Sequence, residues 1–271
     1  MDGNNTHLVR LKNRFWRKER PVIVILSGAG LSAESGIATF RDPSNGWVRT
    51  GALDARDYER DPKAVIEVVN RRIEAYDGAR PNAAHEAIAR FVKRNRLRAD
   101  IVHITQNVDS LCEEAGDTSV FHLHGTFLQS RCTACGAVFP RLGPYSFEDV
   151  CPVCRATHGA VRTNVVFFGE IPYGMDWIPS VLKRADIFLA VGTSGFVYPA
   201  ADFVRMAFKH GCRDRILLAK DVAENEQMLM CDMRVQEFNQ VRRGLATQLV
   251  PRALRDIEEV IEQRDEAQAP D

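Results

Sequence analysis

A run of five aliphatic residues that ends in a glycine-rich turn constrains the fold more than any other feature of this sequence. Val22–Leu26 is followed directly by Ser27, Gly28, Ala29 and Gly30. A short and continuously apolar run is typical of a strand that is buried on both faces, as in a parallel sheet covered by helices. The stretch therefore predicts an α/β protein in which residues 22–26 form a central strand.

Short apolar runs and amphipathic stretches alternate along most of the chain, which predicts a Rossmann-like parallel sheet with helices on both faces. The expected strands are Val22–Leu26, Ile101–Thr105, Val120–Leu123, Ile187–Val191 and Ile216–Leu218. The expected helices are Ser32–Gly36, Pro62–Tyr76, Ala83–Asn95, Asp109–Ala115, Ala200–His210 and Pro251–Gln263.

Two segments interrupt this alternation and are expected to form a smaller lobe. Pro43–Arg80 is polar and helical without a matching strand, and Gln129–Thr163 is rich in cysteine, glycine and proline. We expect a helical part of the small lobe at about 43–80 and a cysteine-containing part at about 129–162. The expected boundaries of the large lobe are approximately 1–42, 81–128 and 163–264, with a disordered tail at 265–271.

The charge balance, the lack of long apolar runs and the number of cysteines indicate which partners and which cellular compartment to expect. The 36 basic residues of this 271-residue chain balance its 36 acidic residues, so we expect no direct nucleic-acid binding. No stretch approaches the ~20 apolar residues of a membrane span, and no secretory signal opens the chain. The basic segment 10–20 is interpreted as a first helix rather than a transit peptide. Seven cysteines, an odd number, favour a reducing compartment and predict a cytoplasmic protein.

The glycine turn itself fits a relaxed dinucleotide-binding pattern. Gly28, Gly30 and Ala33 match G-x-G-x-x-A after a strand, where glycines let backbone N–H groups approach a pyrophosphate. Ser32 is a candidate cap for a following helix. The continuation departs from a hydride-transferring domain, because Phe40 and Arg41 follow instead of a second strand. A glycine turn without a ligand remains an alternative.

Four cysteines form the most specific metal pattern in the chain. Cys132-x-x-Cys135 and Cys151-x-x-Cys154 are separated by fifteen residues, a spacing that suits a tetrahedral zinc site. Four thiolates leave no position for water, so we expect a structural zinc ion in a zinc ribbon. The alternatives are two disulfides or a redox pair.

Polar residues follow the second expected strand and close the third. Gln106, Asn107 and Asp109 stand at the carboxyl end of Ile101–Thr105, where open α/β sheets bind their ligands. His124 precedes Gly125 at the end of another strand and is a candidate general base. The alternatives are helix caps for the former and an ordinary core or surface histidine for the latter.

Together these motifs resemble the sirtuin family of NAD-dependent protein deacylases over about residues 21–259. In chain order the matching motifs are Gly28–Ile37 with Phe40 and Arg41, then Gln106–Asp109, His124 with Gly125, the four cysteines, Val165–Glu170 and Gly192–Ser194. The resemblance implies one catalytic domain over residues 1–271, with NAD as co-substrate and one zinc ion. The most strongly implied activity is deacetylation of lysine, with transfer of the acyl group to ADP-ribose and release of nicotinamide.

The resemblance also implies roles for the matching residues. His124 would be the general base, with Asn107 and Arg41 at the reacting centre. An acyl-lysine peptide would bind as an added strand between Val165–Gly169 and Gly195–Val197, touching Val166, Phe168 and Gly169. The residues implied to bind NAD are Gly28, Ala29, Gly30, Ser32, Ala33, Thr39, Phe40, Arg41, Gln106, Asn107, Asp109, His124, Gly192, Thr193 and Ser194.

Several departures from the family pattern bear on specificity. Members that prefer succinyl- or malonyl-lysine carry a Tyr-x-x-Arg pair, where this chain has Val69 and Arg72, and Leu53 replaces their small alanine. The family's Ile-Asn pair at the adenosine ribose reads Leu218-Ala219. A desuccinylase or demalonylase, an NAD hydrolase or ADP-ribosyltransferase, and a non-catalytic zinc-ribbon module are the alternatives to a deacetylase.

Overall fold

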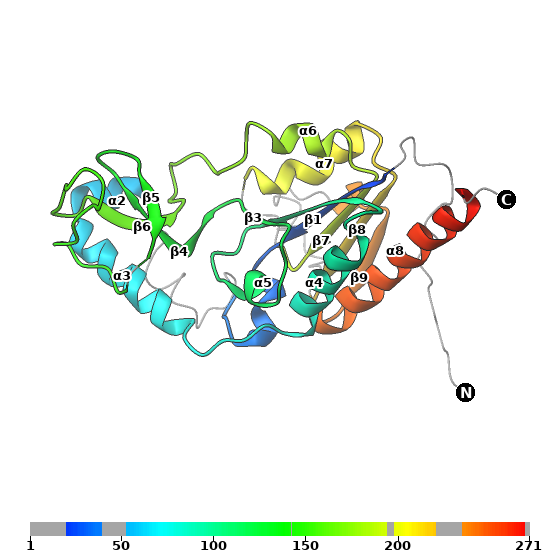
Figure 1. Ribbon diagram of the computed structural model, residues 1–271, viewed down its shortest axis with the longest axis horizontal. Helices are drawn as coiled ribbons and strands as arrows, with labels where there is room; N and C mark the ends of the chain where they lie inside the picture. The colour runs from blue at the N-terminus through cyan, green and yellow to red at the C-terminus, as the bar shows by residue number, and fades with distance from the viewer. Residues whose placement is uncertain (1–19, 40–52, 142, 194–197, 221–234, 269–271) are drawn as a thin grey trace.

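A six-stranded parallel sheet forms the middle of the larger part of the molecule in the computed structural model (Figure 1). The structure describes residues 20–39, 53–141, 143–193, 198–220 and 235–268. Neighbouring strands follow the order β3-β2-β1-β7-β8-β9. Their bounds are β1 Val22–Ser27, β2 Asp100–Thr105, β3 Val120–His122, β7 Ile187–Val191, β8 Asp214–Ala219 and β9 Gln240–Arg243.

Strand β1 shows why the sheet is buried on both sides. Its side chains alternate, so that Ile23 and Ile25 join one apolar cluster while Val24 and Leu26 join the other. Helices α4 and α8 cover the first face, and α6 and α7 cover the second (Figure 1). The fold class predicted from the sequence is therefore confirmed. The helix bounds are α4 Ala83–Asn95, α5 Leu111–Glu114, α6 Ile178–Leu182, α7 Phe203–Lys209 and α8 Ala246–Gln268.

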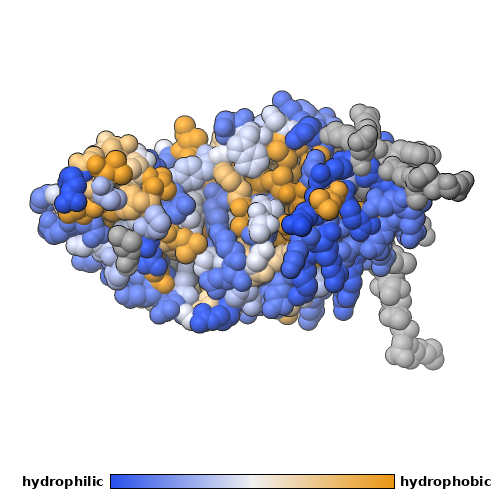
Figure 2. All heavy atoms as spheres, viewed as in Figure 1, coloured by the Kyte–Doolittle hydropathy of each residue, from blue (hydrophilic) through white to orange (hydrophobic). Residues whose placement is uncertain are grey.

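A smaller lobe lies at the opposite end of the molecule from α8 (Figure 1). Its three antiparallel strands follow the order β5-β4-β6. Tyr58, Val69, Phe127 and Phe167 belong to an apolar cluster separate from those of the large sheet. Figure 2 shows apolar side chains gathered on the surface of this lobe, whereas the surface over α4 and α8 is mostly hydrophilic. The elements are α2 Ala55–Arg60, α3 Pro62–Ala75, β4 Gly125–Cys132, β5 Val138–Pro140 and β6 Val161–Val165.

All five strands expected from the apolar runs are present. The three small-lobe strands β4, β5 and β6 were not predicted, and within the parallel sheet the edge strand β9 was missed. Its sequence, Gln-Val-Arg-Arg, lacks the apolar signal because an edge strand is not enclosed on both sides. The short helix α6 was also missed, since it has only five residues and Pro179 stands in its first turn. Strand β9 is defined by its pairing with β8, and helix α6 buries Ile178. Neither contact can be recognised from a short stretch of sequence.

Three expected helices need correction. Ser32–Gly36 is not an α-helix, because residues 29–31 and 33–35 form two 3₁₀ turns, η1 Ala29–Leu31 and η2 Ala33–Ser35. The helix predicted from Ala200 begins at Phe203, after the 3₁₀ turn η3 Ala200–Asp202. Helix α8 begins at Ala246 rather than Pro251, because the carboxylate of Glu34 accepts hydrogen bonds from the N–H and hydroxyl of Thr247 in its first turn.

The predicted disordered tail is wrong for its first four residues. Helix α8 continues to Gln268, and Asp265 Oδ2 lies 2.6 Å from Nε of Arg98. Residues 269–271 and the helix expected at 10–20, apart from Arg20, lie outside the described residues. The lobe boundaries remain a prediction. In the part of the chain that the structure describes, no helix is long and apolar enough to cross a membrane.

Candidate active site

A cavity of about 620 Å³ opens at the carboxyl edge of the parallel sheet, between the two lobes. The sheet supplies residues after β1, β2, β7 and β8, and the smaller lobe supplies Tyr76 and residues 165–170. Most residues predicted to bind NAD or peptide line this one cavity. They are Gly28, Ala29, Gly30, Ala33, Thr39, Gln106, Asn107, Asp109, His124, Val166, Phe168, Gly169, Gly192 and Thr193.

Five predicted site residues are placed differently. Ser32 and Arg72 are buried but do not line the cavity. Phe40, Arg41 and Ser194 lie outside the described residues. Conversely, Tyr76 lines the cavity although it belongs to none of the sequence motifs. It lies four residues after Arg72, on the same face of α3, so helical spacing was the signal that could have found it.

The glycines of the first turn are required by contact between two loops. The N–H of Gly28 donates to Val191 O at 3.0 Å, and the N–H of Gly30 donates to Gly192 O at 2.9 Å. A Cβ on Gly30 would lie 2.6 Å from the Cα of Gly192. These two N–H groups are therefore engaged within the protein. The N–H of Ala29 has no hydrogen-bond partner among the described residues, so it is a donor available in the cavity wall.

Ser32 does not cap a helix, contrary to the sequence-based expectation. No capping hydrogen bond forms from its side chain. Its hydroxyl instead donates to Asp109 Oδ2 at 3.0 Å and accepts from Nδ2 of Asn107 at 3.0 Å. The reason is that a 3₁₀ turn brings Ser32 under the loop after β2. Ser32 thus fixes Asn107 and Asp109, two of the three polar residues that line the cavity from that loop.

His85 completes the surroundings of Ser32 and was missed from the sequence. Its Nδ1 accepts from the N–H of Asn82, so Nε2 carries the proton and faces Ser32 Oγ at 3.3 Å. Burial, followed by the charge of His103, lowers the pKa of His85 to about 4. Burial also raises the pKa of Asp109 above its usual value. The spacing Asn82-x-x-His85 at a helix start is the signal that could have pointed to this pair.

Asn107 is also held through its backbone. Its N–H donates to Thr105 Oγ1 at 3.1 Å, and its carbonyl accepts from Nδ1 of His122 at 2.8 Å. Nε2 of His122 lies 2.8 Å from Oε1 of Glu113. Although burial alone would lower the pKa of His122, the interaction with Glu113 raises it. Asn107 is therefore fixed in the cavity wall before any ligand binds.

His124 has one defined ring proton. Its Nδ1 lies 3.1 Å from the carbonyl of Gln106, which can only accept, so Nδ1 donates and Nε2 is left with its lone pair. Burial lowers the pKa of His124, which keeps the ring neutral near pH 7. Gly125 follows with φ +73°, and a Cβ there would lie 1.8 Å from Asn164 O. Only glycine fits that position, which explains the His-Gly pair in the sequence.

Residues 165–170 form the cavity wall opposite the glycine turn. The N–H of Phe168 donates to Leu53 O at 2.7 Å, and its carbonyl accepts from Ala55 N at 3.0 Å. The buried guanidinium of Arg162 hydrogen-bonds Glu170, which also accepts from the N–H of Phe167 at 2.8 Å. The segment is thus tied to α2 and to β6, while the Phe168 side chain stays 47% exposed.

The four cysteines meet in the smaller lobe as the sequence predicts. Their sulfur atoms all lie within 4.8 Å of one another. Cys132 Sγ and Cys154 Sγ are 3.7 Å apart, and Cys135 Sγ and Cys151 Sγ are 3.8 Å apart. A tetrahedron with zinc–sulfur bonds of about 2.3 Å has edges of about 3.8 Å. The four thiols therefore fit a structural zinc ion, and the six described cysteines form no disulfide.

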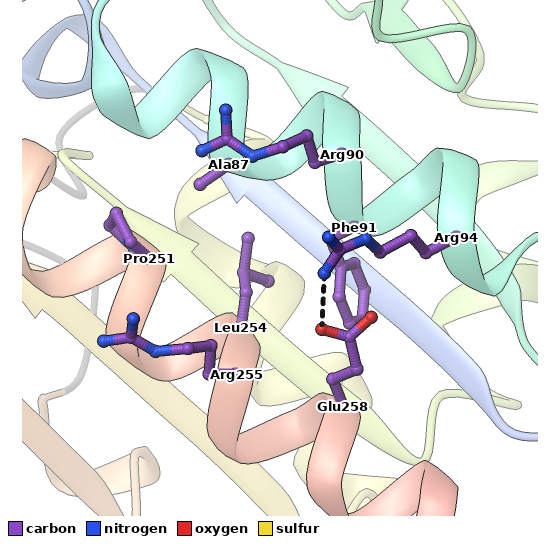
Figure 3. A pocket seen from close by; sticks show the side chains of 8 residues that line it. All are labelled: Ala87, Arg90, Phe91, Arg94, Pro251, Leu254, Arg255 and Glu258. Atoms are coloured by element: carbon purple, nitrogen blue, oxygen red, sulfur yellow. Dashed lines mark ion pairs between the residues drawn. The ribbon is translucent and has the colours of Figure 1, made fainter.

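A second, smaller hollow lies between α4 and α8, far from the cysteines (Figure 3). It measures about 210 Å³ and has Phe91 and Leu254 in its floor. Arg94 and Glu258 form an ion pair of 3.7 Å across it. None of the residues predicted to bind a ligand lines this hollow. The larger cavity is therefore the candidate active site.

The fold and cavity define a class first: α/β proteins that bind a nucleotide at the carboxyl edge of a parallel sheet. Comparison with known proteins gives the family. The chain belongs to the Sir2 family, whose sequence model matches residues 28–199. This confirms the resemblance on which the sequence analysis relied.

Individual relatives agree with this assignment. A Caulobacter vibrioides protein named NAD-dependent protein deacylase is 40% identical over 233 residues, or 84% of this chain and 93% of that one. A protein of the same name from Escherichia coli K12 is 43% identical over 198 residues, or 71% and 70%. A solved Sir2 homologue–NAD complex is 31% identical with a TM-score of 0.73 and covers 88% of this chain and 90% of that chain.

Proposed function

We propose that this protein is an NAD-dependent protein-lysine deacylase. The acyl group of a modified lysine would be transferred to ADP-ribose with release of nicotinamide. The observation that carries the proposal is the state of His124 in the cavity wall. Its Nδ1 donates to Gln106 O, and its Nε2 keeps a lone pair between the glycine turn and residues 165–169. The names of the curated relatives support the same activity.

His124 acts as the general base in this proposal. Its Nε2 takes a proton from a ribose hydroxyl, and the resulting charge is shared with the carbonyl of Gln106. Because burial lowers the pKa of His124, the ring is neutral and able to accept a proton at pH 7. Gln106 itself donates to Thr193 Oγ1 at 2.8 Å, which keeps both residues at the cavity wall.

Asn107 and Asp109 form the pocket for the nicotinamide carboxamide. The Asn107 amide nitrogen is committed to Ser32, so its Oδ1 is left to accept a hydrogen bond from the ligand. The Asp109 carboxylate accepts from Ser32 and from the N–H of Leu111. These contacts hold the two side chains in place, and a positioned group needs no reorganisation when the ligand binds.

The phosphate groups lie at the glycine turn in this proposal. The N–H groups of Ala29 and Thr193 have no hydrogen-bond partner among the described residues and come from the two loops that touch at Gly30 and Gly192. Two such N–H donors form a suitable site for a pyrophosphate. Ala33, Thr39 and the predicted residues Phe40, Arg41 and Ser194 complete the proposed dinucleotide site.

The acyl-lysine peptide contacts the opposite wall. Both backbone polar groups of Phe168 are already bonded to α2 and its N-terminal flank, so this residue contributes its side chain. The carbonyl of Val166 and the N–H of Gly169 have no hydrogen-bond partner in the part of the chain that the structure describes. They are the groups with which an extended peptide would pair, as in β-augmentation.

We infer a preference for short acyl groups. Leu53 and Val69 are buried in the small-lobe cluster, Leu53 is bonded through its backbone to Phe168, and neither side chain can form a hydrogen bond. Arg72 is the candidate cation for an acidic acyl group, but it does not line the cavity, and burial lowers its pKa to about 10. A succinyl carboxylate would therefore lack the pair of donors that its burial requires.

Incubation of the purified protein with NAD and a panel of acyl-lysine peptides tests the proposal. Mass spectrometry should show peptide-dependent formation of nicotinamide and O-acyl-ADP-ribose, together with the peptide whose lysine side chain has lost its acyl group. NAD hydrolysis at the same rate without peptide, or ADP-ribose attached to protein, would contradict a deacylase and support the other NAD-consuming activities. The single catalytic domain and the cytoplasmic location remain predictions from the sequence.

A further inference from the structure

A chain of buried polar groups runs beneath the cavity. Asp117 Oδ2 lies 2.6 Å from Nδ1 of His103, and Nε2 of the same ring lies 2.7 Å from Ser27 Oγ. Ser27 Oγ lies 2.9 Å from Thr105 Oγ1, which accepts the N–H of Asn107 at 3.1 Å. Four consecutive contacts thus connect the Asp117 carboxylate to the backbone of Asn107.

Apart from Asn107, no residue in this series of hydrogen bonds can touch a ligand. The His103 and Asp117 side chains are 0% and 1% exposed, and Ser27 and Thr105 are fully buried. None of these four residues lines the cavity. A serine, a histidine and an aspartate in this order resemble a hydrolytic triad, but a nucleophile without access to substrate has no such role. Any effect on the reaction has to pass through other residues.

This series of hydrogen bonds connects three strands that are neighbours in the sheet, β1, β2 and β3. Ser27 ends β1 and is followed by the glycine turn, while Thr105 ends β2 and is followed by Gln106. Asp117 lies just before β3 and also accepts the N–H and hydroxyl of Ser119 at 2.8 Å. Two of the loops that carry the predicted dinucleotide-binding residues, those after β1 and β2, therefore begin on this hydrogen-bonded chain.

Stability alone does not account for these polar residues. The surrounding positions of β1 are aliphatic, and apolar side chains could fill the same space. Replacing a buried ion pair by apolar residues of similar volume is often neutral or stabilising, so a buried polar contact such as that of His103 with Asp117 is weak evidence for a stabilising role. A role in fixing the geometry of the adjacent loop agrees better with its position.

We propose that His103 and Asp117 are positioning residues that set the orientation of the Asn107 peptide unit through Ser27 and Thr105. This inference rests on the proposed function, in which Asn107 holds the nicotinamide carboxamide. His122 holds the carbonyl side of the same residue from β3. Loss of the contact to Thr105 leaves the peptide unit of Asn107 held by its carbonyl alone, so the side chain shifts about its bond to Ser32 and its amide oxygen points less accurately at the ligand.

A pair of substitutions at the last link tests the inference. Thr105→Val removes the hydroxyl and keeps the shape, whereas Thr105→Ser keeps the hydroxyl. One lost neutral hydrogen bond corresponds to about a threefold to tenfold change in affinity. We expect the inhibition constant of free nicotinamide to rise by this factor in Thr105→Val and in His103→Leu. Thr105→Ser should stay within about twofold of the wild type.

Binding of ADP-ribose provides the readout that separates positioning from general damage. ADP-ribose lacks the nicotinamide ring, so its calorimetric affinity should change by less than about twofold in the same variants. Equal weakening of both ligands, or unchanged nicotinamide inhibition in Thr105→Val, would overturn the inference. If His103→Leu fails to fold, the Thr105 pair alone decides. A wild-type protein that binds no ADP-ribose would refute the proposed function itself, a distinct outcome.

Discussion

The polar residues at the sheet edge and the cysteines of the smaller lobe are organised in opposite ways. Asn107 and Asp109 both hydrogen-bond the hydroxyl of Ser32, and all three residues are buried. The four thiols instead approach one another at Sγ–Sγ distances of 3.7 and 3.8 Å, and Cys135 and Cys154 are exposed. As thiolates they would repel one another unless a cation lay between them. The first site is held together by hydrogen bonds within the fold, whereas the arrangement of the second suits thiolates held together by a metal ion.

This difference follows from how each region is buried. The sheet edge lies on strands enclosed by helices on both faces, and two apolar clusters hold its loops in place. The smaller lobe has a separate apolar cluster, and two of the metal ligands, Cys132 and Cys151, belong to it. A small core gives limited stability, and a structural metal is a common supplement. We therefore expect metal loss and polar substitutions to have different consequences.

Removal of the metal should have the largest effect. Cys132→Ala, or a strong chelator, should unfold the smaller lobe, because structural zinc contributes on the order of 10 kcal/mol to the folding of a closed Cys₄ site. Activity should be lost along with the wall at residues 165–170. Metal analysis and limited proteolysis provide the measurements, with about one zinc per chain expected in the wild type.

Cys212→Ala is the matched control, because Cys212 is also buried but lies in the sheet cluster next to α7. It should keep the metal and the proteolysis pattern. A metal-free preparation with full activity would contradict the difference between the two regions.

Substitution of His124, the proposed general base, should slow the reaction without disturbing the preassembled cavity. His124→Ala is expected to reduce kcat by about 100-fold or more, the usual scale for a general base. ADP-ribose binding and the melting temperature should change little, because the neighbouring loop is held by other contacts. Steady-state kinetics and calorimetry measure the two quantities. His210→Ala, an exposed histidine after α7, is the control.

The pH profile sharpens this prediction. Only the neutral ring of His124 accepts a proton, and burial lowers its pKa below the usual 6.5. The value of kcat/KM should therefore fall as the pH drops, with a midpoint below pH 6.5. A midpoint well above 6.5 would assign the base to another group.

His85 makes the sheet edge sensitive to acid. Its pKa is about 4 in the folded protein against 6.5 for an ordinary histidine, so the unfolded chain binds more protons between these values. The stabilisation is complete above pH 6.5 and is lost as the pH falls from about 6.5 to about 4. The loss amounts to about 3 kcal/mol.

Urea unfolding at several pH values measures this effect. His85→Gln can keep both hydrogen bonds, to Asn82 and Ser32, without titrating. It should flatten the dependence of the free energy of unfolding on pH in this window. An unchanged slope in the variant would show that the acid sensitivity comes from other residues.

Acyl preference is the smallest expected effect. Acetyl-lysine peptides should have a higher kcat/KM than succinyl-lysine peptides, because one missing hydrogen bond to a charged group is worth about 1.5–3 kcal/mol. Val69→Tyr should raise relative desuccinylation. Arg72→Met should lower it and spare deacetylation. A wild-type preference for succinyl-lysine by about tenfold would show that Arg72 reaches the acyl group.

Local sequence patterns were sufficient to predict a strand whose residues are all buried and a site whose ligands have a fixed spacing along the chain. The apolar run at Val22–Leu26 marks β1 because every residue of the strand is enclosed, and the two C-x-x-C pairs mark the metal site because knuckle spacing is set by the ligands. Local patterns failed at β9, whose identity depends on pairing with β8. They failed also at Ser32, where the role of the hydroxyl depends on residues 75 and 77 positions away.

The sequence by itself therefore determined the class of fold, the metal ligands and which polar residues gather at the sheet edge. Only the tertiary structure decided how those residues are held. The buried connection from Asp117 through His103 to Asn107 has no sequence signature, because its members come from separate strands and loops. The glycines at positions 30 and 192 likewise reflect the contact of two loops rather than a local turn. Periodicity records which face of an element is buried, whereas hydrogen-bond partners follow from the packing of distant elements.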